Sequence, residues 1–276
     1  MNDIFDKVAE LSETNFQKNP YDFFKDGLLY CGLCHTKKTT LAEVPEIGRS
    51  KVVSCLCECE KKKRDDEERE RRGAAIVELR RRECFGNGKA MQWTFAADDG
   101  KQDRIKNAMR KYADNFEEMQ KQGRGLLLYG NVGAGKSFFA ACIAHVLIDK
   151  FYSARMIDFG EIEKKVQSTW NGREELFDQL SRYDLLILDD LGAERDSEYM
   201  QQIVYDVINA RYKAGLPLIV TTNLSSDELK NPADMKNARI YSRILEMCLP
   251  VKFEGGDTRR EKLKEYHNPM SELLGL

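Results

Sequence analysis

The stretch GNVGAGKS, Gly130–Ser137, fills every fixed position of the pattern G-x-x-x-x-G-K-[ST]. The short apolar run GLLLY (125–129) precedes it, and SFFAACIAHVLIDK (137–150), whose apolar residues recur at helical spacing, follows it. This order of strand, glycine loop and helix is the context in which the pattern binds phosphates. The glycines let the backbone turn successive N–H groups toward an anion at the positive end of the helix. The context therefore favours a phosphate site over a chance glycine-rich turn.

The motif predicts a role for each part of a nucleotide-binding segment. Lys136 is expected to reach the β and γ phosphates, and the hydroxyl of Ser137 to ligate Mg²⁺. The rest of the segment is expected to wrap the phosphates and comprises Gly130, Asn131, Val132, Gly133, Ala134, Gly135 and Phe138.

Strands and helices alternate outward from this loop. We predict strands at ARMIDF (154–159), YDLLILDDLG (183–192) and LPLIVTTN (216–223). We predict helices at EIEKKVQSTW (161–170) and SEYMQQIVYDVINARYKAG (197–215), the second ending at its glycine. Such alternation indicates βαβ units, so the predicted class is α/β with a parallel sheet flanked by helices.

Polar residues follow two of these strands. A carboxylate at the carboxyl end of a buried strand faces the phosphate loop, so Asp189 is expected to hold Mg²⁺ and Asp190 to polarise the attacking water. Asn223 follows the strand ending in TTN and is expected beside Asp189, where it would orient the water or sense the γ phosphate. The alternatives are a helix cap for the acidic pair and a turn residue for Asn223.

Five cysteines occur in the first sixty residues. YCGLCHTKKTT (30–40) contains Cys31 and Cys34, and SCLCECEKKK (54–63) contains Cys55, Cys57 and Cys59. Two thiolate pairs separated by a loop of this kind are typical of zinc ribbons, so we predict that four of the five bind Zn²⁺.

The sequence leaves open which cysteines complete the zinc site, and His35 is a further candidate ligand. A redox-active dithiol at C-x-x-C is the competing interpretation, which the three additional cysteines disfavour. Cys84, Cys142 and Cys248 are predicted to be structural, the last two within apolar helical patterns.

Composition narrows the function classes. Lys and Arg total 44 against 46 Asp and Glu, so the formal net charge is −2 and a nucleic-acid contact would have to be a local patch. No run approaches the roughly 18 apolar residues of a membrane span, and the N-terminus has no signal-peptide pattern. We expect a cytoplasmic protein without membrane contact, where reducing conditions favour thiolate ligands over disulfides.

The predicted organisation has three parts. Residues 1–60 form a small zinc-binding domain that includes a short helix, DIFDKVAEL (3–11), and residues 89–276 form the ATPase domain. Residues 61–88 are a charged connector, either a solvated helix or a linker, because mixed charges dominate it and its few apolar residues cannot sustain coiled-coil heptads. The basic KKKR beside DDEE is more typical of a solvated face than of a DNA-binding stripe.

Three stretches carry a family resemblance: LLYGNVGAGKSFFAACIAHVL (127–147), YDLLILDDLGAERDSEYMQQIVYDVINARYKAGLPLIVTTNLSSDEL (183–229) and ARIYSRILEMCLPVKFEGGDTRR (238–260). They resemble the AAA+ ATPases of the DnaC and DnaI type, loaders of the replicative DNA helicase related to the IstB transposition helpers. The resemblance spans roughly residues 90–262 and implies a P-loop AAA+ fold that takes ATP rather than GTP.

The resemblance also implies roles for arginines. Arg243 in RIYSRI matches the arginine finger presented to ATP on a neighbouring subunit, with Arg239 a second candidate, so self-association through the ATP sites is expected. Arg259 matches the second sensor, with Arg260 the alternative. Asp190 is the family's base and Asn223 its first sensor, but Asp190 stands where most AAA+ relatives have glutamate, which puts hydrolysis efficiency in doubt.

The resulting hypothesis is an ATP-dependent loader of a DnaB-type hexameric helicase, in which the zinc domain contacts the helicase, the ATPase domain meets single-stranded DNA, and hydrolysis releases the loader. Two alternatives remain: an IstB-like transposition helper, and a nucleotide-switched binding module with little turnover. Nucleotide kinases share the phosphate loop but need lid arginines and an acceptor site, which this sequence lacks.

Overall fold

A computed structural model describes residues 19–44, 49–168, 172–192, 198–232, 234–257, 271 and 273–275. The chain divides into two compact units, residues 1–75 and 76–276, and each is described by itself. The finer predicted division at residues 60 and 88 stays a prediction, and the short helix predicted over residues 3–11 lies outside the described residues.

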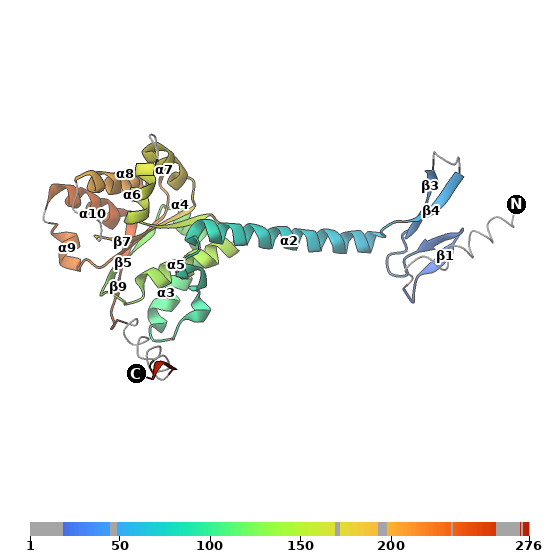
Figure 1. Cartoon of the computed structure of the whole chain (residues 1–276), viewed down its shortest axis with the longest axis horizontal. Helices are drawn as coiled ribbons and strands as arrows, with labels where there is room; N and C mark the ends of the chain where they lie inside the picture. Colours follow the sequence, from blue (N-terminus) through green and yellow to red (C-terminus); the bar gives the residue numbers. More distant parts are fainter. Residues whose placement is uncertain are drawn as a thin grey trace. The chain divides into compact units, whose positions relative to one another are not determined.

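The first unit contains two small antiparallel hairpins. One pairs β1 (Phe23–Lys25) with β2 (Leu28–Tyr30), and the other pairs β3 (Thr39–Val44) with β4 (Arg49–Ser54) (Figure 1). Asp26 and Gly27 turn the first hairpin, both with positive φ. Each hairpin leads into a cysteine-containing turn, so the hairpins position the two thiol pairs.

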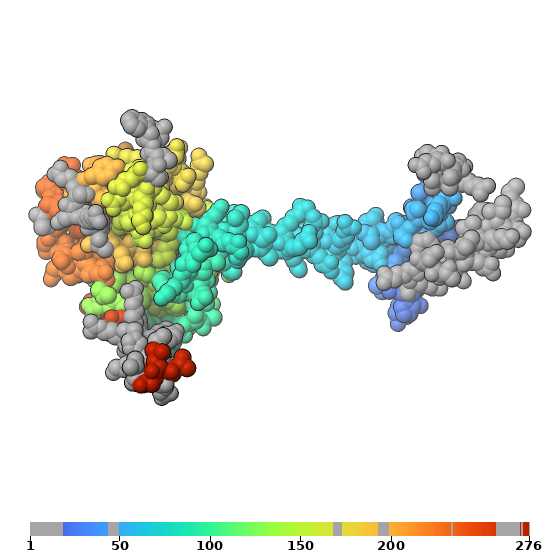
Figure 2. All heavy atoms as spheres, in the orientation of Figure 1, coloured from blue at the N-terminus to red at the C-terminus, as the bar shows by residue number. Residues whose placement is uncertain are grey.

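Helix α2 (Glu58–Phe85) spans most of the charged connector and crosses the boundary between the units. Its charged side chains form pairs at helical spacing, such as Arg72 with Glu68 at 2.5 Å, and most of residues 61–75 are exposed (Figure 2). Such exposed pairs contribute only about 0.3–0.5 kcal/mol each. The end of α2 belongs to the second unit, where Cys84 is fully buried and Arg81 pairs with Asp149 at 2.5 Å.

The second unit is built on a five-stranded parallel sheet in the order β6-β7-β8-β5-β9. Its strands are β5 (Gly125–Gly130), β6 (Ala154–Asp158), β7 (Leu185–Leu191), β8 (Leu218–Thr222) and β9 (Cys248–Phe253). Its other described helices are η1 (Lys89–Gln92), η2 (Phe95–Ala97), α3 (Asp103–Asp114), α4 (Phe116–Lys121), α5 (Lys136–Asp149), α6 (Phe159–Ser168), α7 (Gly172–Ser181), α8 (Glu198–Ala214), α9 (Ser226–Lys230) and α10 (Met235–Met247).

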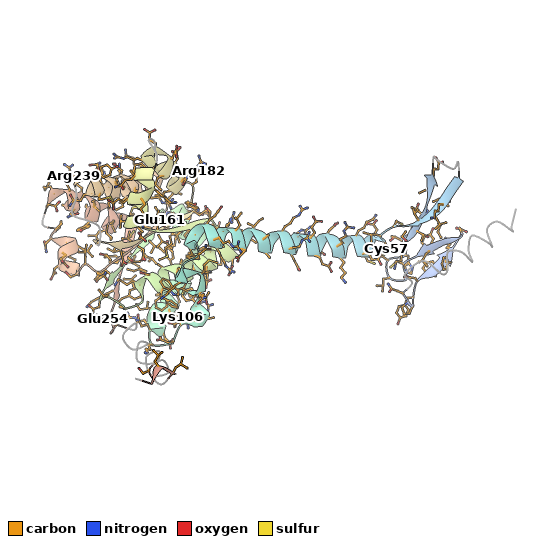
Figure 3. The ribbon with its side chains drawn as sticks, in the orientation of Figure 1. Cys57, Lys106, Glu161, Arg182, Arg239 and Glu254 are labelled. Atoms are coloured by element: carbon orange, nitrogen blue, oxygen red, sulfur yellow. The ribbon has the colours of Figure 1, made fainter. Side chains whose placement is uncertain are left out.

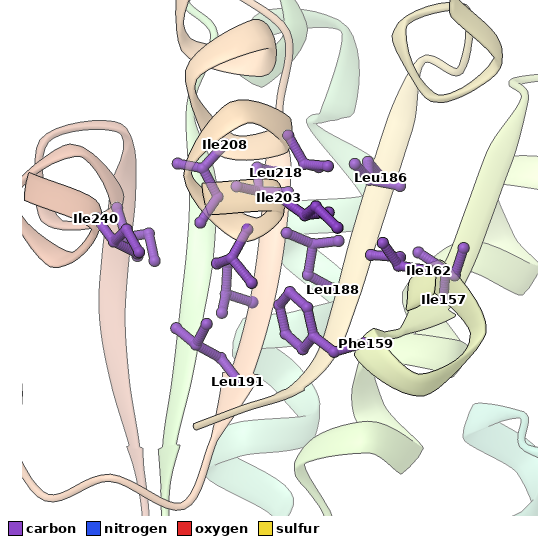
Figure 4. Close-up of a cluster of buried hydrophobic side chains, with 14 of the residues drawn as sticks. Ile157, Phe159, Ile162, Leu186, Leu188, Leu191, Ile203, Ile208, Leu218 and Ile240 are labelled. Atoms are coloured by element: carbon purple, nitrogen blue, oxygen red, sulfur yellow. The ribbon is translucent and has the colours of Figure 1, made fainter. Parts of the chain in front are cut away.

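Both faces of the sheet are covered. Alternate strand residues point to opposite faces, so Leu186 and Leu188 join one apolar cluster while Leu185 and Ile187 join the other. Helices α6, α7, α8 and α10 contribute to the first cluster, shown in Figure 4, and α3, α4 and α5 to the second. Burial on both faces explains the uninterrupted apolar strands of the sequence. The predicted α/β class with a helix-flanked parallel sheet is confirmed.

The fifth strand, β9, was not predicted. It follows α10 without a break, because Cys248 is both the C-cap of the helix and the first residue of the strand. The assignment of Cys248 to a helical pattern is therefore wrong, and its thiol donates to the Leu218 carbonyl oxygen at 3.3 Å. Pro250 is tolerated in this strand because β9 lies at the edge of the sheet.

Among the described helices, none combines the length and the apolar character needed to cross a lipid bilayer.

Candidate functional site

The phosphate loop connects the end of β5 to the start of α5. Gly130, Gly133 and Gly135 have φ of 134°, 76° and 92°, values that side-chain-bearing residues rarely adopt. A Cβ on Gly133 would also lie 2.0 Å from Oδ1 of Asp257, which follows β9. The loop is thus shaped by glycines both for its backbone turn and for the close approach of the chain after β9.

Lys136 is buried at the first position of α5. Its Nζ donates to the carbonyl oxygens of Gly130 and Asn131 at 2.9 and 2.7 Å and to Oδ1 of Asn223 at 2.8 Å. These acceptors are neutral, so phosphate oxygens bound to the loop could replace them as stronger partners of the ammonium. The structure therefore brings Asn223, which follows β8, into contact with Lys136 at the end of the phosphate loop.

The acidic pair lies at the end of β7, where the pairing with β8 shifts register between Leu188 and Leu191. Thr221 of β8 donates from Oγ1 to Oδ1 of Asp189 at 2.6 Å and accepts from the backbone N–H of Asp190 at 2.9 Å. Asp190 has a φ of 59°. Such left-handed backbone is uncommon outside glycine, although aspartate is among the residues that adopt it, and it clusters at functional sites.

Burial raises the pKa of Asp189, and the neighbouring carboxylates of Asp190 and Asp158 raise it further. Hydrogen bonds from Thr221 and Ser137 oppose this shift. A carboxylate that burial and like charges make costly to ionise is stabilised by a divalent cation. The Ser137 hydroxyl and the Asp189 carboxylate together offer the oxygen ligands that Mg²⁺ prefers, so the residues present fit this ion.

Arg243 lies on α10 and packs against α8. Its guanidinium stands over the rings of Tyr205 and Tyr212, 4.5 and 5.7 Å from their centroids, and among the described residues its buried Nη1 has no hydrogen-bond partner. Arg239, on the same helix, is exposed (Figure 3). The structure thus places the two finger candidates in different environments. Arg259 and Arg260 lie outside the described residues.

Thr221 is a site residue that the sequence analysis missed. It lies two residues before Asn223 in LPLIVTTN, and its hydroxyl contacts both members of the acidic pair. The available signal was a hydroxyl residue at the carboxyl end of a buried strand, which is the edge where ligands bind in parallel sheets.

Four of the five clustered cysteines meet in the first unit. The Sγ atoms of Cys31, Cys34, Cys57 and Cys59 lie within 4.8 Å of one another. Cys31 and Cys59 are separated by 3.5 Å and Cys57 and Cys59 by 3.2 Å, while a tetrahedral zinc site with 2.3 Å bonds spaces its sulfurs by about 3.8 Å. The four-thiol donor set and its compactness fit Zn²⁺.

Cys55 and His35 are not members of this cluster. The Cys55 thiol donates instead to the carbonyl oxygen of Lys37 at 3.5 Å. His35 is exposed, with a φ of 55° and its ring 5.8 Å from that of Phe23. Among the described residues, the group of thiols that could hold a metal ion is therefore Cys31, Cys34, Cys57 and Cys59.

Two turns present the thiols. In the first, the His35 N–H donates to the Cys31 carbonyl oxygen at 2.9 Å. In the second, Cys57 precedes α2 and Cys59 lies in its first turn (Figure 3). The Thr36 hydroxyl accepts from the Glu58 N–H at 2.9 Å. Its contact with the Cys34 thiol at 3.1 Å, together with hydrogen bonds from Cys59, lowers the pKa of Cys34 to about 5, whereas burial raises the pKa of Cys57. Cys34 is thus favoured as a thiolate, the form that binds metals.

Replicative helicase loaders are among the curated proteins to which the chain is similar. The chain is 31% identical over 150 residues to the replicative helicase loader DnaI of Bacillus subtilis (strain 168), covering 50% of this chain and 48% of the relative. It is 27% identical over 127 residues to the replicative helicase loader DnaC of Escherichia coli (strain K12), and this match covers 45% of this chain and 52% of the relative. The chain thus spans about half the length of these relatives.

Solved structures give a similar result. The crystal structure of DnaI has a TM-score of 0.50 and 26% sequence identity, and the match covers 59% of this chain and 89% of that one. The crystal structure of the DnaC helicase loader has a TM-score of 0.51 and 22% sequence identity, and the match covers 60% of this chain and 99% of that one. This second match shows similarity of fold alone. The family model described as IstB-like ATP binding protein matches residues 32–265, which include the whole phosphate loop. The chain therefore belongs to the family of IstB-like ATP-binding proteins.

Proposed function

We propose that the chain is an ATP-dependent loader of a hexameric replicative DNA helicase, and that ATP hydrolysis is coupled to release of the loader. The observation that carries the proposal is the 31% identity to a replicative helicase loader over 150 residues. The family supports ATP as the nucleotide. Self-association through the ATP sites and contact with single-stranded DNA are parts of the same proposal.

In this proposal each residue of the nucleotide site has one task. Lys136 exchanges its neutral acceptors for phosphate oxygens, and Ser137 and Asp189 hold Mg²⁺. When bound, Mg²⁺ neutralises charge on the β and γ phosphates. Asp190 accepts a proton from the attacking water, and Asn223, released from Lys136, orients that water or senses the γ phosphate.

Arg243 is proposed to complete the site of a neighbouring copy as its arginine finger. Within the described residues its buried Nη1 has no partner, so a move to a phosphate would exchange the contacts with Tyr205 and Tyr212 for charge-assisted hydrogen bonds. Arg239 is the alternative finger, and Arg259, or Arg260 in its place, is the proposed second sensor.

Turnover by mixed variants tests these assignments. Asp190→Asn and Arg243→Ala are each expected to lower ATP turnover by at least about 100-fold, given what general bases and arginine fingers contribute. If the finger acts in trans, mixing the two variants restores part of the activity, since an Arg243→Ala subunit keeps an intact site beside an intact finger. Restoration by Arg239→Ala instead would assign the finger to that residue.

We further propose that Cys31, Cys34, Cys57 and Cys59 bind Zn²⁺ and that the unit they build contacts the helicase. The fit of four thiols within 4.8 Å supports the metal. A structural zinc supplies folding energy to a small unit, which suits a segment with few buried aliphatic residues.

Binding to the helicase is the decisive experiment. Light scattering coupled to size exclusion should detect a complex between the purified full-length chain and its cognate hexameric helicase with ATP or with ADP. Cys57→Ser should abolish the complex while the matched Cys55→Ser keeps it. No complex in either nucleotide state would remove the loader function.

A transposition helper is the second candidate, because the matching family is described as IstB-like. This function predicts nucleotide-dependent stimulation of a transposase encoded beside the chain, with no helicase complex. A third candidate, a nucleotide-switched binding module, predicts no single-turnover hydrolysis in the wild-type chain.

A further inference from the structure

The interior of the first unit contains more polar than aliphatic side chains. Within its described residues, the buried side chains are those of Asp22, Leu29, Cys31, Lys38, Thr39 and Cys57. A buried lysine is unusual, because removing an ammonium from water is costly unless opposite charges and hydrogen bonds compensate. The contacts of Lys38 therefore call for a structural explanation.

Two carboxylates from distant parts of the unit meet Lys38. Its Nζ lies 3.0 Å from Oδ2 of Asp22, before β1, and 3.0 Å from Oε1 of Glu60, in the first turn of α2. The side chains of Lys38 and Asp22 are 9% and 2% exposed, and that of Glu60 is 37% exposed. The ammonium thus connects two segments almost forty residues apart in the sequence.

Each carboxylate also holds the backbone of one cysteine turn. The Gly32 N–H, between Cys31 and Cys34, donates to Oδ1 of Asp22 at 3.0 Å. The Cys57 N–H donates to Oε2 of Glu60 at 3.3 Å. One carboxylate therefore fixes the first thiol pair, the other fixes the second, and Lys38 joins the two.

The main chain supports the same connection. Lys38 donates its N–H to the Leu29 carbonyl oxygen at 2.7 Å and accepts from the Cys55 N–H at 2.8 Å. Gly32 packs so closely that a Cβ would lie 2.1 Å from the Tyr21 carbonyl oxygen, next to Asp22. The network is consequently held in place by backbone as well as by charge.

We propose that Asp22, Lys38 and Glu60 form a charged clamp that positions the two cysteine pairs for a tetrahedral metal ion. The clamp rests on the zinc site of the proposed function and assigns positioning residues to it. Partners of this kind, which orient the ligands without touching the metal, typically change metal affinity by about 10- to 100-fold when they are lost.

Cobalt binding to the full-length chain tests the clamp. Co²⁺ titration, followed by thiolate-to-metal absorption, gives the affinity, and competition with Zn²⁺ gives that of zinc. Lys38→Met should weaken binding by about 10- to 100-fold, and at saturation the tetrahedral thiolate spectrum should return. The neighbouring exposed Lys37→Met should bind like wild type.

Glu60 provides a graded test that does not remove the buried charges. Glu60→Ala loses the acceptor for the Cys57 N–H, so it should weaken binding and alter the ligand-field bands of bound cobalt, while Glu60→Gln, which keeps an acceptor, should restore part of the affinity. Glu58→Ala, at an exposed position two residues earlier, is the matched control.

The outcomes separate the clamp from the zinc site itself. Affinities of Lys38→Met and Glu60→Ala within about twofold of their controls would overturn the clamp, since lost second-layer partners cost tenfold or more. If Lys38→Met took up no cobalt, the cobalt affinity of Glu60→Ala relative to that of Glu58→Ala would decide whether the clamp positions the cysteine pairs. A wild-type chain that bound neither cobalt nor zinc would reject the zinc site, and the clamp with it.

Discussion

Two lysines are buried in the described part of the chain, one in each unit, and their surroundings differ. Lys38 lies between the carboxylates of Asp22 and Glu60, whereas Lys136 donates to two backbone carbonyls and the amide oxygen of Asn223. Charged partners make an ammonium hard to displace, whereas neutral acceptors are weaker partners that phosphate oxygens can replace. We therefore expect Lys38 to stabilise the first unit and Lys136 to bind an anionic ligand.

The interiors around these lysines differ in the same way. The second unit has apolar clusters on both faces of its sheet, whereas the described part of the first unit buries Leu29 as its one aliphatic side chain. Hydrophobic burial therefore stabilises the second unit, whereas the first unit depends on its thiols and on a network of charged side chains.

Metal removal has the largest expected effect. A chelator, or Cys57→Ser, should unfold the first unit, because structural zinc contributes about 10–16 kcal/mol in zinc-finger peptides. Hydrogen exchange should accelerate in residues 19–57 and stay unchanged in the strands of the parallel sheet. Cys55→Ser is the control, since its thiol lies outside the cluster. Equal acceleration in both units would contradict the division.

An aliphatic truncation has the next largest effect, confined to the second unit. Leu188 is fully buried in β7, so Leu188→Ala should lower the free energy of unfolding by about 2–5 kcal/mol in urea titrations. Leu249→Ala, at a 66% exposed position of β9, is the control and should change it by less than about 0.5 kcal/mol. Zinc content should be the same in both variants.

Replacing each of the two buried lysines by methionine in turn gives the third test. Lys136→Met should weaken ATP binding by about 100-fold, because charge-assisted hydrogen bonds to phosphate are lost, each worth about 1.5–3 kcal/mol. Calorimetric titration with a non-hydrolysable analogue measures this loss. Zinc retention should not change. Lys38→Met should show the reverse pattern, and a loss of both functions in either variant would argue against independent units.

The smallest effect is a pH dependence in the second unit. Burial lowers the pKa of His145, so below pH about 6.5 the unfolded chain binds a proton that the folded chain does not. Stability should therefore fall as pH decreases below that value, by at most about 1.4 kcal/mol per pH unit from this group. His145→Gln, which keeps a donor for the Ala90 carbonyl oxygen, should have a shallower slope between pH 7 and 5 in urea titrations. Parallel slopes would exclude His145 as the source.

The sequence predicted the features that depend on local pattern. The glycine loop, the apolar strand before Asp189 and the helix ending at Gly215 each have a signal within a few residues, and the predicted α/β class is confirmed. Strand β9 escaped prediction because no turn residue separates it from α10 and its pairing partner, β5, lies more than a hundred residues away.

Which cysteines join the four-thiol cluster also depends on the pairing of residues that are distant in the sequence. Thr39 pairs with Ser54, and the Cys55 N–H extends this ladder to the Lys38 carbonyl oxygen. Cys55 thus remains part of the hairpin, and only the residues after it reach the other thiols. The partners of Lys38 and of Thr221 depend in the same way on segments brought together by folding.

Strand β8 lies between β5 and β7, and its carboxyl end contacts both parts of the nucleotide site. Thr221, in the strand, contacts Asp189, and Asn223, directly after the strand, contacts Lys136. Thr222 fixes the bulged end of β7 as well, donating to the Leu191 carbonyl oxygen at 2.6 Å. Because neighbouring strand residues face opposite sides, one residue inserted before Thr221 would move the side chains of Thr221 and Thr222 each to the opposite face of the sheet. Relatives of this chain should accordingly carry length differences before Leu218 or after Asn223, and a constant length between them.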